Sequence, residues 1–138
     1  MAPARLQSPK LYRPWKFREV SIMKTIKNEH ISAIVEKLKS VEPYKVILFG
    51  SYAYGTPTRD SDIDLLVVTG DDSIPNSYDE KMEIHLKVSA VLREIMKQVP
   101  VDLIVYTKPM YRKFVEIGSM FSRELHTKGK ILYERADT

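Results

Sequence analysis

The sequence predicts an α/β fold in which helices flank a small mixed β-sheet, with the first strand antiparallel to the next two. Continuous apolar runs over residues 45–49, 63–69 and 101–106 are typical of strands covered on both faces. Apolar residues at helical spacing precede the first run and recur between the second and third runs. An alternation of such strands and helices favours a sheet with helices packed on it.

Length and composition indicate one compact domain. The chain has 138 residues, 43% of them hydrophobic, which supports a core but leaves no room for a second substrate-binding domain. Because there is no cysteine, disulfides and Cys-based zinc sites are excluded. No apolar run approaches the roughly 18 residues that span a bilayer, and no signal-peptide pattern is present. We therefore expect a cytoplasmic protein without a membrane partner.

Residues 1–22 carry the whole net charge of +4 and are predicted to form a flexible, proline-containing basic arm. They hold five of the 22 basic residues and one of the 18 acidic residues, which leaves 17 of each sign in residues 23–138, the predicted folded domain. An enzyme acting on nucleic acid would be expected to have a basic footprint on its folded part. DNA or RNA is therefore not favoured as a substrate.

The first helix is predicted from residue 25 or 28 to just before Pro43. Apolar residues recur there at three- and four-residue spacing: Ile31, Ile34, Val35, Leu38 and Val41. His30 on this helix is expected to be solvent-facing or at the core edge rather than a ligand.

The strand at residues 45–49 ends in Gly50 and Ser51, and the strand at residues 63–69 opens with Asp62 and Asp64. A glycine allows the backbone to approach a phosphate, and Ser51 adds an N–H and a hydroxyl. Side chains alternate along a strand, so Asp62 and Asp64 should project from the same face. Two converging carboxylates repel unless a cation lies between them, and a hard divalent metal such as Mg²⁺ fits that role.

Residues 78–98 are predicted to form a long packing helix, which Pro100 stops, and His85 on it is expected to be structural. The third strand, residues 101–106, carries Asp102 near its start. Either this carboxylate has a partner, or it simply lies at a solvated strand end; the sequence leaves both open. Two shorter helices are expected at 109–117 and 119–126, before a turn at Lys128 and Gly129, the latter as a helix terminator, into residues 131–133.

Five residues, Gly50, Ser51, Asp62, Asp64 and Asp102, can lie at one edge of the sheet only with one set of strand directions. The first strand must be antiparallel to the second, and the third must be parallel to the second. The long helix then provides the crossover that a parallel connection requires. Asp102 beside Asp62 and Asp64 would provide ligands for two Mg²⁺ ions roughly 3.5 to 4 Å apart, the arrangement used for in-line displacement at phosphorus. The sequence thus predicts Asp62, Asp64 and Asp102 as catalytic metal ligands and Gly50 and Ser51 as nucleotide-binding residues.

Gly50-Ser51, ten further residues, Asp62-Ile63-Asp64 and a later Asp102 resemble the signature of the DNA polymerase β-like nucleotidyltransferase superfamily. The resemblance covers about residues 31–133, and the short length is most similar to the minimal nucleotidyltransferases (MNT). It implies a polymerase β-like nucleotidyltransferase core within residues 23–138. It also implies ATP as a substrate and an antitoxin role, in which AMP is transferred onto a tyrosine of a partner HEPN-type helical toxin. An assembly of this kind would be an oligomer or hetero-oligomer.

This chain departs from the signature at one point. Many relatives have an arginine close to the second glycine of the loop, where this chain has Tyr52 and Tyr54. Phosphate charge would then be left to the metals, Ser51 and Arg59. Two other functions stay open: a small-molecule nucleotidyltransferase of the antibiotic-modifying kind, and a non-catalytic antitoxin that neutralises its partner by binding.

Overall fold

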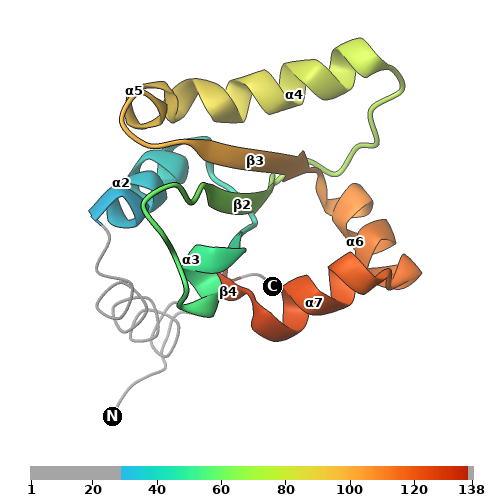
Figure 1. Ribbon diagram of the computed structural model, residues 1–138. Coiled ribbons are helices and arrows are strands. Elements are labelled where there is room, and N and C mark those ends of the chain that lie inside the picture. Colours follow the sequence, from blue (N-terminus) through green and yellow to red (C-terminus); the bar gives the residue numbers. More distant parts are fainter. Residues whose placement is uncertain (1–28, 137–138) are drawn as a thin grey trace.

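The computed structural model describes residues 29–136, which form one sheet with helices on both faces (Figure 1). The elements follow in the order α2 (Glu29–Leu38), η1 (Lys39–Val41), β1 (Lys45–Phe49), α3 (Ser51–Tyr54), β2 (Ile63–Val68), α4 (Tyr78–Val91), α5 (Arg93–Met96), β3 (Val101–Tyr106), α6 (Lys108–Ile117), α7 (Met120–Lys128) and β4 (Lys130–Glu134). The predicted arm at residues 1–22 lies outside the described residues.

The sheet has the strand order β3-β2-β1-β4. β1 pairs antiparallel with β2, and β2 pairs parallel with β3, so the predicted mixed sheet is confirmed. β4 pairs antiparallel with β1 and forms the other edge. β1 and β2 are therefore central, which explains why their residues are almost all buried on both faces.

One face of the sheet packs against α2, α4 and α5. The amphipathic helix α2 contributes its buried stripe to this core, and β2 contributes Ile63, Leu65 and Val67. The opposite face packs against α6 and α7, where Leu66 and Val68 of β2 meet buried side chains of both helices. Alternate residues of β2 thus serve two separate cores, as the period of two requires.

The crossover from β2 to β3 differs from the single packing helix that the sequence predicts. It breaks at Leu92 (φ −101°, ψ 2°) into α4 and α5. In α4 only Val88 is buried, whereas Tyr78 is 72% and Leu86 56% exposed. β3 is an edge strand and α4 lies along it (Figure 1), so the sheet covers only a narrow stripe of this helix. The apolar residues of α4 therefore do not all pack.

Two further local details differ from the predictions. Residues 51–54, read from the sequence as part of a polar loop, form the short helix α3. Gly129 ends α7, as predicted, but with an extended backbone (φ −70°, ψ 164°) rather than the left-handed one typical of helix-ending glycine. A Cβ there would collide with the carbonyl of Leu125, so lack of space explains this glycine. Gly55 of α3 (φ 82°) and Gly118 of α6 (φ 62°) end their helices in the left-handed conformation instead.

Across residues 29–136, no helix is both long enough and apolar enough to cross a membrane. His30 of α2 and His85 of α4 have contacts of the structural kind that was expected. His30 is half-buried, with Nε2 3.2 Å from Oε1 of Gln98. His85 is also half-buried, with Nε2 3.4 Å from the carbonyl oxygen of Leu103.

Candidate active site

The structure brings two of the three predicted aspartates together on adjacent strands. Asp64 of β2 and Asp102 of β3 are paired in register, and Phe49 of β1 is paired with Asp64 on its other side. Asp62 lies one residue before β2 and two before Asp64. Asp64 therefore lies on the central strand between an aromatic residue and a second carboxylate, at the edge where β2 and β3 begin.

The three carboxylates differ in exposure. Asp64 is half-buried, whereas Asp62 and Asp102 are exposed. Within the described residues none of the three forms an ion pair or a side-chain hydrogen bond with the protein. Asp102 therefore has no hydrogen-bond or ion-pair partner among these residues. Its negative charge acts on the neighbouring carboxylate of Asp64.

The charges at this edge repel one another. Burial raises the pKa of Asp64, and the negative charges of Asp102 and Asp62 raise it further. Burial alone would raise the pKa of any carboxyl, but the charges of Asp102 and Asp62 show that the negative charge of this site is not compensated by a cationic group. An arrangement of this kind gains stability when a cation binds.

A divalent cation fits the chemistry of these three side chains, because carboxylate oxygens are the ligands that Mg²⁺ prefers. Their present positions do not form a closed cage. Over the described range, no three carboxylate or imidazole side chains lie close enough together to hold a metal ion. The three aspartates therefore supply the donor oxygens and the negative charge for a cation. They do not enclose it, because Asp62 and Asp102 are exposed and only Asp64 is half-buried.

Gly50 lies directly against Asp64. Its φ of 75° is in the region that favours glycine, and a Cβ at this position would collide with the Asp64 carboxylate. The Gly50 carbonyl accepts the N–H groups of Ala53 and Tyr54, each at 3.0 Å, and so begins α3. The structure thus gives Gly50 a role that the sequence did not reveal, which is to leave room for the central aspartate.

Ser51 is the first residue of α3 and is half-buried. Its hydroxyl has no hydrogen-bond partner among the described residues, so it is available to a ligand. Tyr52 packs against the core under α2, whereas Tyr54 is 37% exposed. The two tyrosines that replace the expected cation therefore have different environments.

Sequence reasoning missed the contribution of α7 to this region. Nζ of Lys128 lies 5.7 Å from the centre of the Tyr54 ring, so a cation does stand beside α3. The ring of Phe121 packs edge-on against Phe49, with centroids 5.4 Å apart. Both residues are more than 60 positions beyond the glycine loop, and the sequence carries no signal that brings them there. Arg59, the candidate suggested by sequence, is exposed in the loop.

The model for the nucleotidyltransferase domain family matches residues 27–126 of the chain. A protein of Methanocaldococcus jannaschii named as a protein adenylyltransferase is 34% identical over 105 residues, which cover 76% of this chain and 92% of that protein.

Solved structures with similar chains include a toxin-antitoxin with AMP-PNP, at 27% identity and a TM-score of 0.46, covering 75% of this chain and 72% of the other. Another is a tri-AMPylated Shewanella oneidensis HEPN toxin in complex with MNT antitoxin, at 22% identity and a TM-score of 0.36, covering 88% and 73%. At TM-scores below 0.5 these overlays are too partial to support an inference about function.

Proposed function

Because the chain belongs to the nucleotidyltransferase domain family, we propose that it transfers AMP from ATP, with Mg²⁺, to a tyrosine hydroxyl of a partner HEPN-type toxin, and so acts as an antitoxin. The observation that carries this proposal is the group of uncompensated carboxylates at one edge of the sheet, with Asp64 between Gly50 and Asp102. The relative named as a protein adenylyltransferase supports a protein acceptor.

Each residue has a distinct part in the proposed reaction. Asp62, Asp64 and Asp102 would hold Mg²⁺, two ions in all, and Gly50 and Ser51 would bind the phosphates. When bound, the metal lowers the pKa of an attacking hydroxyl and neutralises phosphate charge. The acceptor oxygen forms a bond to the α-phosphorus, the bond to the bridging oxygen breaks, pyrophosphate leaves, and the proton of the hydroxyl is released.

The surface beside the site supports an acceptor that is itself a protein. Phe121, which contacts Phe49 next to Asp64, is 41% exposed. The preceding residues Ile117 and Met120 are 67% and 81% exposed. Large apolar side chains exposed together are typical of protein contact surfaces. A partner that covers them would be held close to the carboxylate edge.

The test is incubation of the protein with α-labelled ATP, Mg²⁺ and a purified HEPN-type partner. We expect label on the partner, and its loss when Asp62, Asp64 or Asp102 is changed to Asn. Asp60→Asn is the matched control, because Asp60 is an exposed carboxylate in the loop before β2 that also contains Asp62. Full labelling by Asp64→Asn would contradict the assignment of the carboxylates, and label recovered only on a small-molecule hydroxyl would contradict the acceptor.

A further inference from the structure

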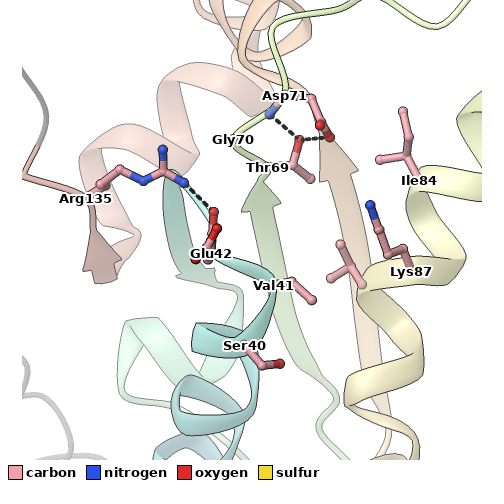
Figure 2. A pocket seen from close by; sticks show the side chains of 10 residues that line it. Ser40, Val41, Glu42, Thr69, Gly70, Asp71, Ile84, Lys87 and Arg135 are labelled. Carbon is pink, nitrogen blue, oxygen red and sulfur yellow. Dashed lines mark hydrogen bonds between the residues drawn. The ribbon is translucent and has the colours of Figure 1, made fainter.

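A cavity lies at the opposite end of β2 from the carboxylates (Figure 2). Its volume is about 450 Å³, within the range of small-molecule sites. It is lined by η1, by the turn from Thr69 to Asp71 after β2, by α4 and by Arg135. From Asp64 to Gly70 the chain rises about 20 Å at about 3.3 Å per residue, so a molecule in this cavity does not reach the carboxylate edge.

Two cationic side chains face this cavity from opposite sides. Figure 2 shows Lys87 of α4 on one side and the Arg135 guanidinium on the other, with the turn after β2 between them. Neither side chain forms an ion pair within residues 29–136. Arg135 donates one bond from Nη2 to the carbonyl of Glu42. A guanidinium has five N–H donors, so most of them remain free for a ligand.

The backbone around Arg135 is shaped to hold this guanidinium. A Cβ at Gly70 would lie 2.8 Å from Nη2 of Arg135 and 3.4 Å from the Glu42 carbonyl oxygen. Glu42, which accepts the bond, has φ 50° and ψ 59°, a backbone conformation that few residues other than glycine adopt. This left-handed residue ends η1, where its N–H bonds to the carbonyl of Lys39, and so fixes the direction of the Glu42 carbonyl. The guanidinium is therefore positioned by its surroundings and is not a freely moving surface charge.

The other walls of the cavity add acceptors and an apolar surface. Asp71 accepts the hydroxyl of Thr69 at 2.9 Å and keeps a second carboxylate oxygen, and the exposed Glu42 carboxylate lies on the Arg135 side. Val41, Ile84 and Val88 form the apolar wall. A matching molecule has an anionic group, hydroxyl donors and a flat apolar part.

We propose that this cavity binds a nucleoside monophosphate. The cationic side chains Lys87 and Arg135 recognise the phosphate, since a guanidinium suits the oxygens of a phosphate. The ribose hydroxyls donate to Glu42 and Asp71, and the base packs on the apolar wall. This site is separate from the carboxylate edge and does not depend on the transfer reaction.

The test is a titration of the full chain, labelled at Ile, Leu and Val methyl groups, with AMP in the presence of EDTA. We expect saturable NMR shifts at the methyls of Val41, Ile84 and Val88. Lys87→Ala should weaken AMP binding about tenfold, the loss expected for one charge-assisted hydrogen bond, and Lys87→Arg should restore most of it. Lys81→Ala is the matched control, because Lys81 is an exposed lysine of α4 that does not line this cavity.

Four results would overturn the proposal. Equal AMP affinity in Lys87→Ala and the parent protein would remove the phosphate site. Loss of binding in Asp64→Asn would place AMP at the carboxylate edge instead. If adenosine binds as tightly as AMP, the cavity does not select a phosphate. The same conclusion follows if an amino acid such as alanine shifts these methyl signals and AMP does not.

Discussion

At the scale of single residues, the contact between Gly50 and Asp64 has a consequence for stability that can be isolated. Gly50 (φ 75°, ψ −164°) and Gly55 (φ 82°, ψ 17°) both have a positive φ, but only Gly55 is in the left-handed helical region, and a Cβ at Gly55 meets nothing within 4 Å. Gly55→Ala should therefore cost only the backbone strain, about 1–2 kcal/mol. Gly50→Ala should cost clearly more in the free energy of unfolding, because its Cβ also collides with the Asp64 carboxylate. Urea unfolding of both variants measures the difference.

A rescue experiment identifies the source of that extra cost. If the Asp64 carboxylate is an obstacle, Asp64→Ala should recover part of the difference in the Gly50→Ala background, the remainder being backbone strain at ψ −164°, while having no such effect in the Gly55→Ala background. Equal losses in the two glycine variants, or no recovery in the double variant, would show that Asp64 moves aside without cost.

The raised pKa of Asp64 predicts how stability depends on pH. Burial and the charges of Asp102 and Asp62 act only in the folded protein, so Asp64 keeps its proton to higher pH there than in the unfolded chain, where 3.8 is the ordinary value. Ionisation is thus disfavoured by folding, and this contribution to stability falls as pH rises from about 3.8 through the raised folded pKa. Asp64→Asn has no carboxyl to ionise at this position, so its stability does not include this loss.

The measurement is urea unfolding of the parent protein and Asp64→Asn between pH 3 and pH 8 with EDTA present. The stability of the variant relative to the parent should increase as pH rises through that window and then stay level. Asp60→Asn, in the exposed loop, is the control for loss of a carboxylate. A difference between Asp64→Asn and the parent that does not vary with pH would contradict the electrostatic account of this site.

At the scale of secondary-structure elements, strand directions followed from the sequence because the five predicted site residues had to meet at one edge. The parallel pairing of β2 with β3 confirms that reasoning. The place of β4 beside β1 did not follow, because its short apolar segment contains no residue of the site. The contacts of Phe121 with Phe49 and of Lys128 with Tyr54 depend on that placement of β4, so the sequence could not predict them either.

The helix α4 shows the limit of hydrophobic periodicity. The pattern identified a helix correctly but could not reveal that β3 is an edge strand, which leaves Leu86 exposed while Leu92 is fully buried. Leu92→Ala should therefore reduce the free energy of unfolding by about 2–5 kcal/mol. Leu86→Ala should change it by less than about 0.5 kcal/mol. Thermal or urea unfolding distinguishes them, and similar losses would mean that α4 packs along its whole length.

At the scale of the whole molecule, the sequence predicts that the net charge and the folded domain belong to different parts of the chain. The family match begins at residue 27, and the 17 basic and 17 acidic residues beyond residue 22 balance one another. The composition indicated this division, and the carboxylate edge and the Lys87 and Arg135 cavity are both built from residues after it. Neither site needs a residue from 1–22 for any contact described above.

A chain that starts at Met23 should therefore keep its function, although it loses the net charge of +4. We expect unchanged affinity for Mg·ATP and a transfer rate close to that of the full chain, because the proposed ligands Asp62, Asp64 and Asp102 are retained. Calorimetric titration with Mg·ATP, beside the labelled-ATP transfer assay, measures both. If transfer alone falls and the full chain loses the same activity at high salt, the basic segment is attracting the acceptor electrostatically. If nucleotide affinity also falls, the segment contributes to the site itself, and the separation of charge from fold is wrong.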